Sequence, residues 1–412
     1  MSRLNRLPYF YGWNIVFTLA ISATVSYGIL FYAFSVFVKP MEEALAWNRS
    51  EIYVAFSLSI LTSALFTIPI GIYLDRFGAR WLMMFGSIIG TLLILAWSQV
   101  QSLLIFYLIW IAIGATTAIL FYDPCFVVIS NWFLARRGLA LTILTLVAGF
   151  ASTIFLPLSE GLIQAHGWRE ALIVLALILC LGTFPLNVFI IRHRPSDMNL
   201  FPDGASHAHT TDHNPAHIVS LRAVFAGPAF WLMTLSFGLA LFGATVIRSH
   251  IVPLLIENGF DSGVAAWAGG IIGAAQVGGR LIFIPFERWI PVIYLTPIIF
   301  ILHGAAIFFL LFKASFPALL AFVILFGAAH GAMTLCRPLL LAQNMDPAIF
   351  GRANSLMSTL ILVSVAAAPL ISSLIYEVDI DYQPVMYLSL ICLFLASFLG
   401  FCLTFISHKT RS

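Results

Sequence analysis

The sequence predicts an all-α membrane protein whose chain crosses the bilayer with twelve helices in two bundles of six. Two observations carry this prediction. Of the 412 residues, 61% are hydrophobic and only 9% are charged, whereas soluble domains carry about a quarter charged residues. In addition, apolar runs recur between short polar breaks, and many reach the roughly 20 residues that a helix needs to cross a bilayer core of about 30 Å.

Six apolar runs precede the longest polar interval of the chain and six follow it. The first six cover residues 15–38, 52–74, 81–100, 103–129, 138–158 and 171–191. The last six cover residues 223–247, 264–286, 289–312, 316–341, 353–376 and 382–407. We therefore expect a first bundle within residues 1–192, a cytoplasmic linker at 193–222 and a second bundle within 223–412.

Lysine and arginine are distributed unequally between the predicted loops. Cytoplasmic loops of membrane proteins carry an excess of these residues. With both termini in the cytoplasm, loops on that side hold thirteen of the twenty, and the opposite loops hold four. The sequence thus predicts an inner (plasma) membrane protein in that orientation. The net charge of +3 reflects this bias, and we read no nucleic-acid-binding surface in it.

The segment GIYLDRFGAR, residues 71–80, lies between the second and third predicted spans. Gly78 allows the tight backbone of a short loop, and Asp75 can meet helix N-termini or the neighbouring Arg76 and Arg80. This pattern resembles the loop motif of the major facilitator superfamily, and the resemblance covers almost the whole chain. It implies two bundles that rock around a central site, with these charges as a cytoplasmic latch. The alternative is a role in topology and stability alone.

Three further segments resemble the monocarboxylate transporter and oxalate:formate antiporter branch of that superfamily. They are YGWNIV at 11–16, FVKPMEEALAWNRSEI at 37–52 and NWFLARRGLALTILTLVAG at 131–149. The resemblance implies an organic anion as substrate. It also places Lys39, at the end of the first predicted span, where the branch has a lysine at the solute mouth. A snorkelling end residue is an equal alternative.

Arg280 has no other charged residue near it between Asp261 and Glu287. An ionisable side chain inside a span is costly unless it faces a cavity, snorkels or pairs, and a guanidinium matches a carboxylate with its fork of donors. The branch resemblance implies that this arginine binds the substrate carboxylate. Anchoring at the membrane surface is the alternative. The adjacent Gly278 and Gly279 favour close helix approach or local bending.

The chain departs from the branch beside this arginine. Proton-coupled members carry an aspartate one helical turn earlier, whereas this chain has Gln276, which we keep as a candidate substrate-binding residue. Oxalate exchangers carry a lysine in the eleventh span, and this chain has none between Arg352 and Glu377. A dianion exchanger is therefore disfavoured, and proton coupling is left open.

Two charged residues each precede a proline within a span, Asp123 in the fourth and Arg337 in the tenth. They occupy near-equivalent positions of the two halves, and the resemblance implies that both spans line the central cavity. We hypothesise an ion pair between them that opens and closes during transport. Structural pairing alone and proton carriage by Asp123 are the alternatives, since desolvation raises a carboxyl pKa and a nearby cation lowers it.

Four other residues are weaker candidates. Arg248 follows the predicted seventh span, where it would add positive potential at the solute mouth or simply anchor the helix. Tyr27, Tyr32 and Tyr122 are candidates to line the solute site, although aromatic residues in so apolar a chain more often pack.

Other chemistries find little support. The linker segment 203–217 holds four histidines and two aspartates, but their spacing matches no closed metal site. The five cysteines lie in apolar runs without metal or redox spacing. We find no phosphate-binding glycine loop and no set of nucleophile, base and orienting residue, so we expect neither an enzyme nor a cofactor.

The sequence therefore predicts a secondary active transporter of a small, monocarboxylate-like organic anion that works by alternating access. Such a carrier would meet only its solute, the lipid bilayer and, if it is a symporter, protons. The alternative is a carrier for uptake or efflux of a bulkier neutral or aromatic compound, such as a drug or vitamin.

Overall fold

The computed structural model describes residues 10–192, 194–198, 200–204, 228–287, 289–312, 315–344 and 347–409. Throughout these ranges the regular structure is helical, with no β-strand. Twelve helices within them are long and apolar enough to cross a membrane. The predicted fold class is confirmed.

The first six spans contain several interruptions. They are formed by α1 (Gly12–Tyr27), a π-helical turn (Gly28–Tyr32) and α2 (Phe34–Leu45); by α3 (Arg49–Phe77); by α4 (Ala79–Ser98); by α5 (Leu103–Leu120) with α6 (Tyr122–Trp132); by α7 (Arg137–Ala148) with α8 (Ala151–His166); and by α9 (Trp168–Phe189). Two short 3-10 turns follow, Pro195–Met198 and Pro202–Gly204.

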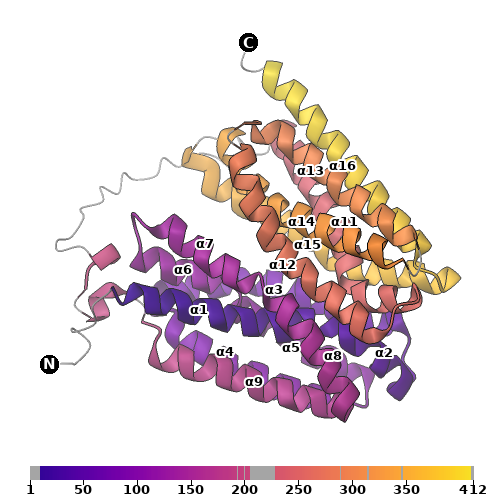
Figure 1. The fold of residues 1–412 in the computed structure, drawn as a ribbon. Helices are drawn as coiled ribbons and strands as arrows, with labels where there is room; N and C mark the ends of the chain where they lie inside the picture. Colours follow the sequence, from indigo (N-terminus) through magenta and orange to yellow (C-terminus); the bar gives the residue numbers. More distant parts are fainter. Residues whose placement is uncertain are drawn as a thin grey trace. The chain divides into compact units, whose positions relative to one another are not determined.

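The last six spans are less interrupted. They are α11 (Pro228–Glu257), α12 (Ser262–Glu287), α13 (Val292–Phe308) with a 3-10 turn (Phe309–Leu311), α14 (Phe316–Asn344), α15 (Pro347–Asp379) and α16 (Gln383–Lys409). Figure 1 shows them in colours from pink-red through orange to yellow.

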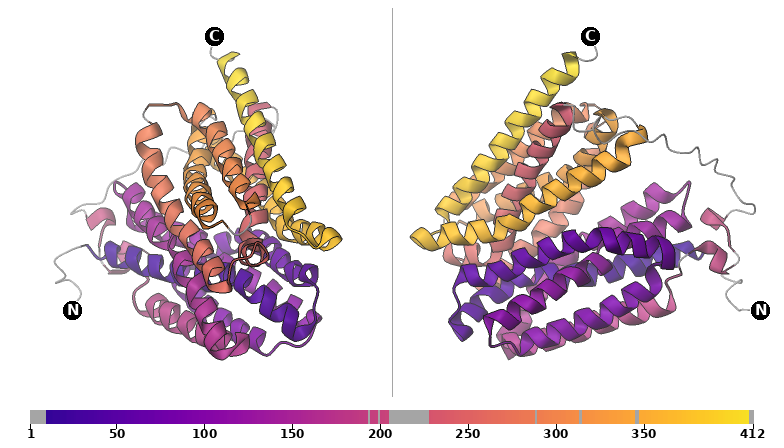
Figure 2. Two further views of the ribbon diagram at one scale, coloured as in Figure 1. Left: turned by 45° about the vertical axis from the view of Figure 1, so that its right-hand side comes forward. Right: turned by 180° about the vertical axis from the view of Figure 1, so that it is seen from behind.

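Contacts divide the helices into two units, which are Met1–Phe34 with Thr62–Asp212, and Ser35–Leu61 with His213–Ser412, as far as each is described. In the first unit α9 packs against α1 and α4. In the second, α16 packs against α11 and α13, and α14 packs against α12 and α13 (Figures 1 and 2). Residues 35–61 of the early spans therefore pack with the late spans. The bundle, linker and bundle boundaries at 1–192, 193–222 and 223–412 stay a prediction.

The first and fourth spans have irregular backbone at mid-length. Gly28 opens the π-helical turn, and a Cβ there would overlap the ring of Phe155. In the fourth span Phe121 is extended, with φ −84° and ψ −157°, and separates α5 from α6. Pro124 then lies in the first turn of α6, where backbone N–H groups need no intrahelical acceptor. In transporters such breaks in the membrane line binding cavities.

Helices α12 and α14 touch backbone to backbone because glycines face each other's chains. A Cβ at Gly279 would overlap the carbonyl of Ala328, and one at Gly331 would overlap the carbonyl of Gln276. Small residues permit this approach between membrane helices. Of the two glycines that the sequence marks beside Arg280, Gly279 makes the close contact, whereas Gly278 faces open space.

We expect Gly279→Ala to destabilise the protein, because overpacking costs about 1–3 kcal/mol. Gly278→Ala should be neutral or stabilising, since alanine is favoured over glycine inside a helix by about 1 kcal/mol. Thermal unfolding of the purified variants in detergent checks both. Equal melting temperatures for the two variants would contradict the close α12–α14 contact.

Candidate functional site

Four cationic or basic side chains gather inside the second unit, and we call Arg248, Arg280, His303 and His330 the cation cluster. Nη1 of Arg248, on α11, lies 2.8 Å from Nε2 of His330, on α14. The ring of His303, on α13, lies 5.6 Å from the His330 ring, centroid to centroid. Arg280, on α12, is close enough to act electrostatically on His330.

The two histidines of this cluster are deeply buried. His303 has 0% and His330 has 5% of its surface exposed, whereas Arg248 and Arg280 are half-buried. The His303 ring packs in a T-shaped arrangement with the ring of Phe326, with 4.2 Å between the ring centroids. Positive charge inside an apolar bundle marks a functional site by default.

Gln276 and Arg280 lie one turn apart on α12, and the glycine contact described above presses this part of α12 against α14. Gln276 is 5% exposed. Three of the predicted site residues, Gln276, Arg280 and Arg248, thus lie toward one buried region. His303 and His330 also lie there and were not predicted from the sequence. Sequence reasoning missed both histidines because each stands alone in an apolar run.

Arg248 needs a correction. The sequence places it just beyond a seventh span that ends at Ile247, but α11 continues to Glu257. Arg248 therefore lies inside the helix and not at the end of the span, and its guanidinium contacts His330. Lys39 is likewise inside α2, which ends at Leu45, and not at the end of the first span.

Aromatic rings gather in the first unit at the two irregular spans. The Tyr27 ring stacks on Phe121 at 3.7 Å and meets Tyr122 at 4.7 Å. Tyr122 in turn stacks on Phe126 at 5.4 Å. We call these four residues the aromatic cluster. Tyr27 and Tyr122, two of the predicted solute-lining residues, are therefore neighbours.

Asp123 and Tyr32 lie close enough to Tyr27 to act electrostatically on it. Asp123 is exposed and occupies the first turn of α6, where a carboxylate is stabilised by the helix dipole. Arg337 is half-buried in the second unit, and α14 continues through Pro338 without the break that Pro124 marks. The ion pair between Asp123 and Arg337 stays a prediction.

The loop between the second and third spans is a single residue, Gly78, with φ +80°. Asp75 and Arg76 lie in the last turn of α3, and the Asp75 side chain lies outside the described part of the structure. Arg80 donates from Nε to the carbonyl of Val188, 2.9 Å away, near the end of α9. A cation at a helix C-terminus is stabilising, so Arg80 has at least a structural role.

Asp203, from the linker, caps the loop between α6 and α7. Its carboxylate accepts hydrogen bonds from the backbone N–H groups of Leu134 at 2.8 Å, Ala135 at 2.7 Å and Arg136 at 3.2 Å. Burial acts to raise the pKa of Asp203, but these donors outweigh it and the pKa is lowered. The cap is therefore kept at neutral pH and is lost only as the pH falls through that lowered pKa.

No group of three or more His, Cys, Asp or Glu side chains in the described ranges is placed to hold a metal ion. The four linker histidines all lie in residues 205–227, outside the described residues.

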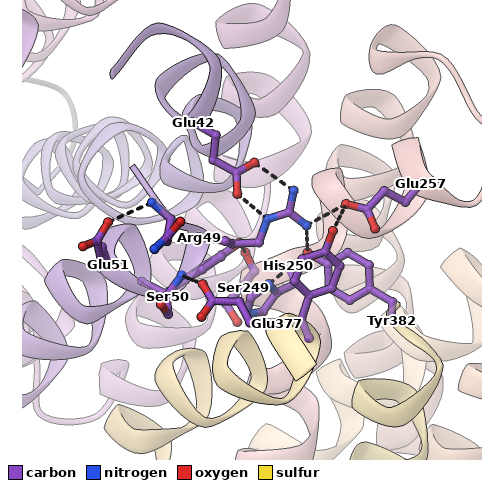
Figure 3. Close-up of polar contacts among 12 residues, drawn as sticks. Glu42, Arg49, Ser50, Glu51, Ser249, His250, Glu257, Glu377 and Tyr382 are labelled. Carbon is purple, nitrogen blue, oxygen red and sulfur yellow. Dashed lines mark hydrogen bonds and ion pairs between the residues drawn. The ribbon is translucent and has the colours of Figure 1, made fainter. Parts of the chain in front are cut away.

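A second polar group surrounds the buried Arg49, and we call Glu42, Arg49, Glu257, Tyr376 and Tyr382 the Arg49 cluster. Figure 3 shows Arg49 with Glu42, Glu257 and Tyr382. The Arg49 side chain is 7% exposed. It holds both Glu42 oxygens, at 2.6 and 2.8 Å, and reaches Glu257 at 2.7 Å and the Tyr382 hydroxyl at 2.9 Å. Its central carbon lies 4.2 Å from the Tyr376 ring centroid.

A chain of contacts continues from this cluster along α3. The Tyr53 hydroxyl donates to the Ser249 carbonyl at 2.8 Å, and its ring lies 3.8 Å from that of His250. His250 contacts the Tyr382 hydroxyl at 3.1 Å and Ser372 Oγ at 2.8 Å. These contacts join α3 to α11, α15 and the start of the last span. The sequence gives Arg49 only as a loop charge, because its partners are distant along the chain.

The Major Facilitator Superfamily model matches residues 19–302, more than half of the chain. The chain belongs to the Major Facilitator Superfamily. The names of the family and of the relatives indicate a transporter rather than an enzyme. The crystal structure of the nucleoside transporter NupG has a similar fold, with a TM-score of 0.76 at 12% identity over 94% of this chain and 99% of that one.

Three superfamily relatives place the chain more narrowly. The uncharacterized transporter YcxA of Bacillus subtilis is 26% identical over 72% of each chain. The oxalate:formate antiporter of Oxalobacter formigenes is 26% identical over 57% of this chain and 53% of its own. Monocarboxylate transporter 13 of Bos taurus is 28% identical over 41% of this chain and 39% of its own. The chain thus spans less than two thirds of the last two relatives, and the predicted resemblance to their branch is confirmed.

We expect Glu42→Gln to lower the stability of this superfamily member by about 2 kcal/mol, because a hydrogen-bonded carboxylate is removed from a buried guanidinium. Glu43→Gln is the matched control, since Glu43 is the exposed neighbour on the same helix. Tryptophan fluorescence during thermal unfolding in detergent measures both variants. Equal melting temperatures for the two variants would show that the Arg49 cluster contributes little to stability.

Proposed function

We propose that this protein is a secondary active transporter that moves a small, monocarboxylate-like organic anion across the inner membrane by alternating access. The observation that carries the proposal is the cation cluster, in which two arginines and two histidines from four helices converge in an apolar interior. Opposite charges attract more strongly there than in water. The similarity to an oxalate:formate antiporter and a monocarboxylate transporter supports the same substrate class.

Arg280 is the proposed carboxylate ligand, because its planar fork can donate two parallel hydrogen bonds to one carboxylate. Gln276, one turn earlier on the same helix, is an amide that can donate to a second oxygen of the solute. Arg248 adds a further positive charge from α11. In the proposed orientation, with both termini cytoplasmic, Lys39 and Arg248 precede Arg280 on the path of an entering anion.

A bulkier aromatic solute is the second candidate, and the aromatic cluster favours it. Tyr27, Phe121 and Tyr122 gather at the breaks of the first and fourth spans, and aromatic rings of this kind stack favourably with a planar solute. Tyr32, at the end of the π-helical turn, belongs to the same proposed lining. A neutral aromatic compound would need only this cluster and no cationic side chain.

We expect Arg280→Ala to raise the KM for a carboxylate at least about tenfold, since a charge-assisted hydrogen bond contributes about 1.5–3 kcal/mol. Uptake of radiolabelled lactate and benzoate into proteoliposomes measures this. Arg280→Lys should be intermediate, because it keeps the charge and loses the fork. Arg136→Ala, at an exposed loop arginine, is the control and should behave as wild type.

The neutral amide benzamide separates the two candidates, because it has the ring of benzoate without its charge. Benzamide uptake that is unchanged in Arg280→Ala, together with no lactate uptake by the wild type, would replace the anion proposal with the second candidate.

Gating by Asp123 and Arg337 is a further part of the proposal, with Asp75, Arg76 and Arg80 as the cytoplasmic latch. We expect Asp123→Arg and Arg337→Asp each to reduce transport strongly, because in the proposed pair each substitution would place like charges together. The double swap should restore a measurable part of it if the two residues pair. A double variant no better than either single variant in lactate uptake would rule the pairing out.

A further inference from the structure

We propose that His330 carries the coupled proton, taking it up when a carboxylate bound by Arg280 also takes the donors of Arg248, and giving it up when the carboxylate leaves. The inference rests on the proposed function as an anion transporter. The inference assigns the coupled proton to a residue of α14. The position that is an acid in the proton-coupled members of the branch is Gln276 here, and an amide cannot take up that proton.

The contact between Arg248 and His330 fixes the state of the imidazole. A guanidinium has only donors, so Nη1 of Arg248 donates and Nε2 of His330 accepts across their 2.8 Å. His330 is therefore neutral and carries its proton on Nδ1. A doubly protonated His330 has no lone pair for Arg248 and would place two positive charges in contact. Arg248 and a proton thus compete for the same nitrogen.

The surroundings of His330 can accept a positive charge on its ring only if an anion arrives at the same time. The charged or titratable groups that act on it are Arg248 from α11, Arg280 from α12 and His303 from α13. Two of these three are permanent cations. A carboxylate between the arginines would remove the cause that keeps the imidazole neutral, because an opposite charge favours protonation.

His303 provides a partner for the Nδ1–H group. Among the described residues, neither His303 ring nitrogen nor His330 Nδ1 has a hydrogen-bond partner, although both side chains are buried. Leaving such buried polar groups unpaired is unfavourable. A small rotation of either ring would let His330 Nδ1–H donate to a His303 nitrogen, since the ring centroids are 5.6 Å apart. That bond is strongest when His330 is charged.

The resulting cycle conserves charge. Before binding, Arg248 is a cation and His330 is neutral. The incoming carboxylate takes the Arg248 donors, Nε2 becomes free and one proton from the open side of the membrane binds there. Anion and proton together add no net charge to the buried site. On the opposite side the carboxylate leaves, Arg248 returns to Nε2 and the proton goes to water. The stoichiometry is one proton per monovalent anion.

The decisive variant is His330→Gln, because a glutamine oxygen can accept from Arg248 but cannot carry a proton. His166→Gln, at an exposed histidine near the end of α8, is the matched control. Both are reconstituted in proteoliposomes that contain a trapped pH-sensitive dye, and lactate is the probe. Three quantities are measured: pH-gradient-driven lactate accumulation, internal acidification during uptake, and lactate:lactate exchange at equal pH.

In the wild type and in His166→Gln we expect acidification to accompany lactate accumulation, with uptake insensitive to membrane potential. In His330→Gln we expect accumulation and acidification to fall at least tenfold while exchange remains, since exchange needs no net proton movement. Retained exchange also shows that the variant is folded.

Failure of the inference and failure of the proposed function give different results. Wild-type uptake of lactate without proton movement, or pH-driven accumulation that persists in His330→Gln, would overturn the role of His330 and leave anion transport in place. Loss of exchange together with accumulation would make His330 a binding or structural residue and would also overturn the role. Absence of any lactate transport by the wild type would reject the proposed function itself.

Discussion

Burial of positive charge in an apolar helix bundle is the constraint on which this structure depends, because an ion removed from water must find compensation. The second unit meets the constraint in two ways. Arg49 is compensated within the chain by two carboxylates, a hydroxyl and an aromatic face. Arg248 instead faces a neutral imidazole, which accepts a hydrogen bond but supplies no negative charge. The first arrangement holds the fold together, and the second is part of the anion site that we propose.

Much of the fold could be predicted from the sequence because a bilayer imposes a simple rule of length and hydropathy on each span. The runs that predict the twelve spans overlap the observed helices, and errors fall at the ends. The helices α2 and α11 run on to Leu45 and Glu257, past charged or polar residues that hydropathy treats as a boundary. Several of those residues, Glu42, Arg248 and Glu257 among them, have polar partners in the fold, and hydropathy contains no information about partners.

The candidate site was only partly predictable for the same reason. Arg280 is conspicuous because a lone charge in an apolar run is costly wherever it lies. His303 and His330 are not, because a single histidine in a span is as compatible with packing as with function. Their significance comes from the crossing of α11, α13 and α14. Arg49 was obscured differently, since it resembles an ordinary loop charge until Glu257 and Tyr382, far along the chain, are brought to it.

The glycine contact between α12 and α14 has a mechanical consequence. Two helices that meet at their main chains have no layer of side chains through which to slide, so they behave as one rigid plate during any conformational change. In the proposed transport cycle we therefore expect the separation between Arg280 on one helix and His330 on the other to stay nearly constant. Adjustment to solutes of different size is then expected from α11 and from side-chain rotation, and Arg248 would be the member of the group that moves.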